Sequence, residues 1–372
     1  MTDARIELQR ATERLLAEHP PSAVSGRQIA AEADVNYGRV HRHFGSKDQL
    51  IQTTVDELGQ RYLSDARPPG ALSPTPGVLL RHESFARSVA NLLLDDPLPQ
   101  PGPLGRLAAA HRDGIAALRE DLPDDEIDVV GCLSIAIEFA GVIHWRQLER
   151  IRMLSGLETS VHREVVHTLT RLVAGRGPFV GRPRPVPVAS RFGDAARPEG
   201  NETVGERLIV AATELLAEKA PSAITGRELA ARAGVNYGRI HSTFGSASDV
   251  CSSAIDLESA RLLSGYGNDD LPGFFSMNAH PGFVRFLTRL SLAPDSGDER
   301  RFFPFLERLY ARHEDRHGAI APVTRFRYSL SVMTQITWAL LGPSLAAALQ
   351  RPIDELEPTA AGYLGALIRY ES

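Results

Sequence analysis

Residues Ser22–Ser46 read SAVSGRQIAAEADVNYGRVHRHFGS, and residues Ser222–Ser246 read SAITGRELAARAGVNYGRIHSTFGS. The two stretches lie 200 residues apart, align without a gap and are identical at 16 of 25 positions. An internal repeat of this kind decides the architecture before any other feature is considered. Its layout of two short helical segments around a tight turn is typical of a helix-turn-helix. The chain is therefore predicted to carry two DNA-reading heads on one polypeptide.

Short-range signals place the helices inside each head. Two residue pairs have the spacing of a capping box, in which both side chains satisfy free backbone donors: Ser25 with Gln28, and Thr225 with Glu228. The turn is expected at Asp34 in the first head and at Gly234 in the second, with a positive φ at both. Asn36 and Asn236 are expected to cap the helix that follows the turn, which ends near Phe44 or Phe244.

The repeat continues beyond the heads. FARSVANLLL from Phe85 aligns with FVRFLTRLSL from Phe283 at an offset of 198 residues. Apolar spacing is helical almost everywhere, which predicts an all-α fold made of two similar halves. Each half is expected to contain a long apolar helix, roughly 126–151 and 324–349, and a shorter closing helix, roughly 159–174 and 359–370.

These patterns predict five parts of the chain. They are a first helix-turn-helix head at 1–62, a first C-terminal helical domain at 78–174, a linker rich in Pro, Gly and Arg at 175–202, a second head at 203–263, and a second C-terminal helical domain at 273–372.

Composition sets outer limits on the function. The 372 residues are 43% apolar and carry a formal net charge of −5, so the whole molecule is not a basic nucleic-acid binder. Cys132 and Cys251 are expected to be reduced, buried thiols. No cleavable signal is visible, and the longest apolar run, 129–143, is too short to cross a membrane. A soluble, cytoplasmic protein without a membrane partner is expected.

Positive charge is nevertheless concentrated where a recognition helix is expected. Between residues 36 and 47 the first head has Arg39, Arg42 and Lys47 without an acid, whereas the second head has only Arg239 between 236 and 247. A short capped helix with clustered cations can enter a major groove, and Lys47 is expected on a phosphate. The predicted DNA-contacting residues are Ser25, Arg27, Asn36, Tyr37, Gly38, Arg39, His41, Arg42, His43 and Lys47, with Thr225, Arg227, Asn236, Tyr237, Gly238, Arg239 and His241 in the second head.

The same stretch resembles the TetR family of bacterial transcriptional regulators. The resemblance rests on Ile29-Ala30, Ala33-Asp34-Val35, Asn36, Gly38, His43-Phe44, Ser46-Lys47 and Leu50, and it is strongest in HFGSKDQL. Both copies have histidine, His41 or His241, where the family usually has tyrosine. The resemblance implies an all-α subunit with an N-terminal DNA head and a C-terminal domain that dimerises through two helices and holds an effector pocket. It therefore also implies a regulatory role for the two C-terminal domains at 78–174 and 273–372. Each half has the size of one such subunit, so the chain resembles a tandem fusion.

Other residues were weighed as sites of chemistry. Six side chains on the long apolar helices are candidates for an effector pocket: Glu138, His144, Trp145, Tyr328, Gln335 and Trp338. HRDG from His111 and RHEDRH from Arg312 are interpreted as solvated helix faces. The sequence contains no phosphate-binding loop, dinucleotide fingerprint, zinc spacing or nucleophile elbow, so no enzyme, cofactor or metal site is expected.

These observations together predict a ligand-responsive transcriptional repressor. Its halves are expected to pair within one chain, as a pseudo-dimer, on an imperfectly palindromic double-stranded operator, and a small-molecule effector is expected to lower its affinity. One alternative is a small-molecule-sequestering protein whose second DNA head has decayed, which Ser242, Thr243 and Ala247 favour. Another alternative is pairing of two chains, which gives four heads.

Overall fold

The computed structural model describes residues 4–95, 102–179, 183–185, 203–219, 221–264, 275–293 and 303–369. Within these residues the regular structure is entirely helical, which confirms the all-α prediction. The first half contains α1 (Ala4–Glu18), α2 (Gly26–Glu32), α3 (Gly38–Phe44), α4 (Lys47–Ala66), α5 (Glu83–Asp95), α6 (Pro103–Leu118), α7 (Asp124–Ile143), α8 (Trp145–Ser155) and α9 (Val161–Ala174), with the 3₁₀ turns η1 (Pro21–Ala23), η2 (Val78–Arg81) and η3 (Gly177–Phe179).

The second half repeats this order with one helix fewer among its described residues. It contains α10 (Val204–Glu218), α11 (Gly226–Arg232), α12 (Gly238–Thr243), α13 (Ala247–Ser264), α14 (Pro281–Leu292), α15 (Phe303–His317), α16 (Pro322–Ala348) and α17 (Ile353–Arg369), with η4 (Pro221–Ala223) and η5 (Ser276–Ala279). The 198-residue offset holds for α5 and α14 and for the turns before them, since Gly77 and Phe275 both have a positive φ, 81° and 64°.

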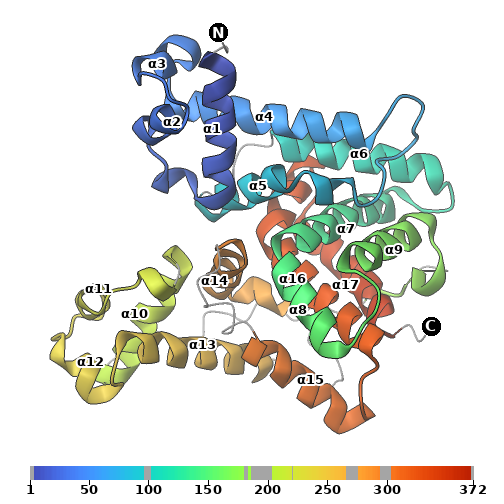
Figure 1. The fold of residues 1–372 in the computed structure, drawn as a ribbon. Helices are drawn as coiled ribbons and strands as arrows, with labels where there is room; N and C mark the ends of the chain where they lie inside the picture. The colour runs from blue at the N-terminus through green and yellow to red at the C-terminus, as the bar shows by residue number, and fades with distance from the viewer. Residues whose placement is uncertain are drawn as a thin grey trace.

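Each head is a three-helix unit carried by the following long helix. In the first head, α1, α2 and α3 enclose a small apolar core of its own. The corresponding core of the second head is continuous with the main one. In Figure 1 both heads lie at the left of the molecule, with α3 at the top and α12 at the bottom. α6, α7, α9, α16 and α17 lie in the body at the right, and α13 and α14 lie between this body and the second head.

The long helices of the two halves pack on each other at the centre of the body. α7 is buried along its whole length from Ile127 to Ile143, and α16 from Phe326 to Trp338. α16 lies against α7 and α8, and α17 also contacts α7 (Figure 1). A helix that is apolar all round belongs in a core, which explains why these two helices show so little amphipathicity.

The body departs from the predicted helix bounds at two places. The helix expected at 126–151 breaks at His144, and α7 and α8 meet there at 77°. His144 is fully buried, and its Nδ1 lies 2.7 Å from Ser291 Oγ of the other half, so tertiary contact fixes the bend. The closing helix expected from 359 begins at Ile353 instead, so Pro358 lies inside α17.

Length and composition would let α16 cross a membrane, as would the bent pair α7 and α8 taken together. In α16, however, 83% of the apolar window is buried inside the protein, as in the core helix of a globular domain.

The start of the predicted linker also packs on the body. The buried ring of Phe179 lies 6.1 Å from that of Tyr363 on α17, whose hydroxyl donates to Glu126 Oε2 of α7 at 3.2 Å. The rest of the predicted linker, apart from 183–185, lies outside the described residues.

Candidate DNA-contacting surface of the two heads

The first helix of each helix-turn-helix is capped by a hydroxyl. Ser25 Oγ accepts from the Gln28 backbone at 3.2 Å, and Gln28 Oε1 accepts from the Ser25 backbone at 2.8 Å, so the predicted capping box is present. Thr225 Oγ1 likewise accepts from the Glu228 backbone at 3.3 Å. The Glu228 carboxylate instead binds Lys219 Nζ at 2.5 Å, so the second predicted box is only half formed.

The turn between the two helices has the predicted backbone conformation. Asp34 has a φ of 51° and Gly234 a φ of 63°. After each of them the chain closes with one backbone bond, from Val35 to the Ala30 carbonyl at 2.9 Å and from Val235 to the Ala230 carbonyl at 3.0 Å. Because these bonds are equivalent, the two heads present their second helices in the same way.

An asparagine precedes the recognition helix of each head, α3 in the first and α12 in the second. The Oδ1 atoms of Asn36 and Asn236 each accept from the backbone two residues on, at Gly38 and Gly238, at 2.9 Å. Asparagine at this position satisfies a donor that the helix itself cannot pair. Both side chains are exposed, so the capped helix starts at the surface.

A tyrosine ring lies over a glycine in both heads. A Cβ atom added at Gly26 would stand 2.7 Å from Cε2 of Tyr37, and one at Gly226 would stand 2.7 Å from Cε2 of Tyr237. The rings remain partly exposed, at 38% and 47%. These glycines were not among the predicted site residues, although each directly follows the capping hydroxyl residue in both copies. The absence of a side chain at these glycines lets the ring of a predicted DNA-contacting tyrosine pack against the backbone, a contact called the tyrosine seat below.

His41 links the two ends of the recognition helix α3. Its Nδ1 lies 2.9 Å from the Gly45 carbonyl, and its Nε2 lies 3.1 Å from the Tyr37 hydroxyl. A carbonyl only accepts, so Nδ1 carries the proton, and in the neutral ring Nε2 accepts from the tyrosine. His241 repeats the contact with the Gly245 carbonyl at 2.7 Å. Histidine at the position where the family usually has tyrosine therefore orients Tyr37 within the head.

The predicted cations of α3 lie free on the surface. Arg39 and Arg42 are exposed, and neither guanidinium makes a hydrogen bond or ion pair within the described part of the chain. Arg27 and Ser25 on α2 are exposed as well, as are Thr225, Arg227 and Arg239 in the second head. Guanidinium groups without a protein partner are available for phosphate or base edges.

Two predicted contacts take part in the fold of the first head. Lys47 Nζ donates to the carbonyls of Pro21 and Val24 at 3.0 and 3.1 Å, which holds α4 against η1. One of its three donors is left for the expected phosphate. The His43 side chain is half-buried and its Nε2 is buried, so it is less accessible to DNA than the exposed Arg42.

The second recognition helix is shorter and less charged. α12 ends at Thr243, one residue earlier than α3 by the 200-residue offset, and Phe244 is only half-buried. Ser242 occupies the place of Arg42, and its Oγ donates to the Arg239 carbonyl at 3.1 Å. The two heads therefore share their inner surface and differ at its outer end.

Comparison with known proteins matches both heads. The profile of the family described as "Bacterial regulatory proteins, tetR family" matches residues 8–54 and again 208–250. This chain is 34% identical over 139 residues to the HTH-type transcriptional repressor Rv3405c of Mycobacterium tuberculosis. It has the same identity over the same length to the HTH-type transcriptional regulator Mb3439c of Mycobacterium bovis. That stretch covers 37% of this chain and 69% of each relative. The chain belongs to the TetR family.

The family assignment confirms a DNA-binding regulator with a tandem duplication. Two separate profile matches show that one polypeptide carries two TetR-type heads. The 139 matched residues make up 69% of each relative, so each relative is about half as long as this 372-residue TetR-family chain.

The six side chains predicted to line an effector pocket do not all come together. Trp145 is 38% exposed at the start of α8. His144 bonds Ser291, and the Tyr328 ring lies 6.2 Å from that of Tyr310. The other three residues belong to the cores of two different halves.

Glu138 lies at the centre of a buried polar cluster in the first half. Its Oε1 accepts from the Gly77 backbone at 2.8 Å, and its Oε2 accepts from the Tyr62 hydroxyl, which is 3.2 Å from His111 Nε2. Burial raises the pKa of Glu138 to about 7 and lowers that of His111 to about 4. The interpretation of HRDG as a solvated face is wrong for His111, because α6 packs between α4 and α7 and buries it.

Gln335 is the counterpart of Glu138 in the second half. Its Oε1 accepts from the Phe275 backbone at 3.1 Å, at the residue equivalent to Gly77. The ring of Trp338 lies 5.3 Å from that of Phe275. The two halves thus build the same contact with a carboxyl in one and an amide in the other.

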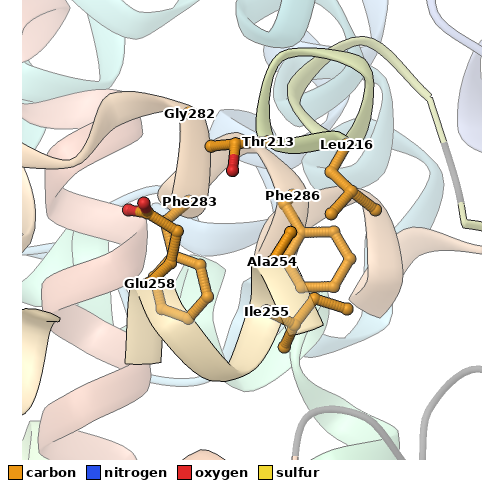
Figure 2. A pocket seen from close by; sticks show the side chains of 8 residues that line it. All are labelled: Thr213, Leu216, Ala254, Ile255, Glu258, Gly282, Phe283 and Phe286. Carbon is orange, nitrogen blue, oxygen red and sulfur yellow. The ribbon is translucent and has the colours of Figure 1, made fainter. Parts of the chain in front are cut away.

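Two hollows of very different size lie where each head meets the body. In the second half α10, α13 and α14 enclose a space for about one water molecule (Figure 2). Figure 2 shows Phe283 and Phe286 facing Ala254 and Ile255, with the Glu258 carboxylate at one side. At the equivalent place in the first half a wider groove is lined by polar side chains, among them Glu13, Arg61, Asp65 and His82. None of the six predicted pocket residues lines either hollow.

Proposed function

We propose that this TetR-family chain is a ligand-responsive transcriptional repressor that binds one imperfectly palindromic operator as a covalent pseudo-dimer. The observation that carries the proposal is the pair of equivalent recognition helices. Asn36, Tyr37, Gly38 and Arg39 recur at 236–239 with the same cap, the same exposed arginine and the same tyrosine seat. A repressor role agrees with the name of the Mycobacterium tuberculosis relative.

Pairing within one chain is supported by the packing of the body. α16 lies against α7 and α8, and α17 against α7, so the helices that would join two subunits already meet here. Tethering also raises the effective concentration of the second half to about the millimolar range. One chain in the bacterial cytoplasm therefore supplies both heads for one operator.

The two half-sites of the operator should match at the bases read by Arg39 and Arg239 and differ at the flanking bases. Arg39 and Arg239 are each expected to read a base, at a cost of about 1–3 kcal/mol when replaced by alanine. Arg42 has no counterpart, because Ser242 stands in its place. One flank of the operator should therefore contribute more to binding than the other.

The effector response is supported by the buried cluster around Glu138. Tyr62 belongs to α4, the helix that carries the first head, whereas His111 and Glu138 belong to α6 and α7. A molecule or proton that rearranges these groups would move α4 relative to the body. The effector is expected to act through the first half, where the cluster is ionisable.

Selection from random DNA, followed by footprinting and light scattering, tests the proposal. Wild-type protein should protect two related half-sites, scatter as a single 40.5 kDa chain when free, and add the mass of one such chain to each operator DNA. Loss of binding in Arg39→Ala with no effect of Arg239→Ala would indicate a decayed second head. A stable species of twice that mass would indicate four heads from two chains. Failure to select any DNA would favour the sequestering alternative.

A further inference from the structure

Two arginines connect the halves reciprocally at the base of the heads. On α5, Arg87 Nε donates to the Ala17 carbonyl of α1 at 2.9 Å, and its Nη2 donates to the Leu292 carbonyl of α14 at 2.5 Å. On α14, Arg289 Nε donates to the Ala217 carbonyl of α10 at 3.0 Å, and its Nη2 reaches the Leu94 carbonyl of α5 at 3.4 Å. Each guanidinium therefore joins the first helix of its own head to the opposite half.

All four acceptors are carbonyls that their own helices leave unpaired. Ala17, Ala217, Leu94 and Leu292 each lie in the last turn of a helix, where carbonyls lack an intrahelical donor. The negative end of the helix dipole lies there as well, so a cation is favoured. Each guanidinium thus satisfies two helix ends that point toward the boundary between the halves.

The geometry requires the shape of arginine as well as its charge. The Arg87 side chain is only 12% exposed, and burial lowers its pKa. A guanidinium directs its donors in a rigid planar fork, whereas a lysine ammonium is a single point on a flexible stem. Lysine at position 87 could reach one carbonyl but could not hold both in a fixed relation.

The place of these contacts relates them to head position. α1 and α10 are the first helices of the two heads, and α14 lies against α5 at the boundary of the halves (Figure 1). A shift of one head relative to the other must stretch a bond from Arg87 or Arg289. The shorter cross-half bond of Arg87 makes it the stiffer of the two connections.

We propose that Arg87 and Arg289 are positioning residues that fix the separation and rotation of the two heads and thereby set the half-site spacing of the operator. The inference rests on the proposed pseudo-dimer. The arginines touch no DNA in this scheme. Their effect is on discrimination between operators that have the same half-sites and different spacers.

Two nearby residues provide matched controls in the same region. Asn91 Nδ2, also on α5, donates to the Leu16 carbonyl at 2.8 Å, so it ties α5 to the head within one half. Arg146 Nη1 donates to the Ala293 carbonyl at 3.0 Å, so it crosses between the halves at the end of α14. Arg87 and Arg289 each bond both a head and the opposite half, and these two variants remove other bonds of the same region.

The first experiment measures affinity for a series of operators whose spacer varies by one base pair at a time. Wild-type protein should bind one spacer length best. In Arg87→Lys, the ratio of the affinity for that operator to the affinity for one whose spacer differs by two base pairs should fall by about tenfold. Arg289→Lys should give a smaller loss in the same direction, and Asn91→Ala and Arg146→Ala should keep the wild-type ratio. An unchanged ratio in both lysine variants would overturn the inference.

A second measurement does not depend on DNA binding. Spin labels at Ala31→Cys and Ala231→Cys, exposed and equivalent positions on α2 and α11, report the distance between the heads. Arg87→Lys should broaden this distance distribution, whereas Arg146→Ala should not. If wild-type protein selects no operator, the proposed function fails. If it does and the distance distribution stays narrow in Arg87→Lys, only the present inference fails.

Discussion

Replacing Glu138 by glutamine should stabilise the protein at neutral and alkaline pH but not in acid. Burial raises the pKa of this carboxyl from 4.5 to about 7, so the folded state prefers the neutral form. Between these pH values the unfolded chain releases a proton that the folded chain keeps, and stability falls as pH rises. At about 1.4 kcal/mol per pKa unit, ionisation of the buried carboxyl lowers the free energy of unfolding by about 3 kcal/mol above pH 7.

Glutamine retains the contacts of the protonated acid. Its Oε1 can accept from the Gly77 backbone as Glu138 Oε1 does at 2.8 Å, and its amide can donate to the Tyr62 oxygen. The Tyr62 proton is then free to turn to His111 Nε2, 3.2 Å away. The expected gain for Glu138→Gln is therefore near zero at pH 4.5 and about 2–3 kcal/mol at pH 8.

His111 works in the opposite direction and sharpens the test. Burial lowers its pKa from 6.5 to about 4, so this group adds stability as pH rises from about 4 to 6.5. In the wild type the two trends partly cancel. Glu138→Gln removes the opposing trend, so its stability should rise with pH more steeply than that of the wild type between pH 4.5 and 6.5.

Urea denaturation followed by circular dichroism at several pH values measures the difference. Gln335→Glu provides the reciprocal variant, because it places a carboxyl on the equivalent Phe275 backbone donor of the second half. It should lose stability over the same pH window. A stability difference between Glu138→Gln and the wild type that stays constant from pH 4.5 to 8 would refute the assignment of Glu138 as a buried, protonated acid.

Three further outcomes are expected. Gly26→Ala should weaken operator binding about tenfold with little change in melting temperature, because its Cβ would stand 2.7 Å from Tyr37 Cε2 and displace the ring. Fluorescence anisotropy measures the affinity, and an unaltered value would contradict the role of Gly26 in positioning Tyr37. Lys47→Ala should lower thermal stability because two carbonyls lose their donor, and a salt titration that also loses about 0.9 in slope would confirm the expected phosphate contact. His41→Phe should weaken operator binding more than His241→Phe does, since only His41 has a described bond to the tyrosine hydroxyl; equal losses would argue against this positioning role.

The sequence by itself determined the local structure of the heads and their duplication. The Ser25 cap, the positive φ at Asp34 and Gly234, and the asparagine at the start of each recognition helix were all predicted, and all are present. Each depends on hydrogen bonds between residues at most five positions apart. Interactions of that range are encoded in the residue types themselves, so their spacing in the chain is sufficient evidence.

Contacts between distant residues were decided only by the tertiary structure. The bend at His144 depends on Ser291, and the burial of His111 depends on α4 and α7. The bonds of Arg87 and Arg289 to the opposite half join residues that no local pattern relates. A repeat in sequence specifies two similar halves, but the surface on which they meet follows from which side chains the packed helices bring together.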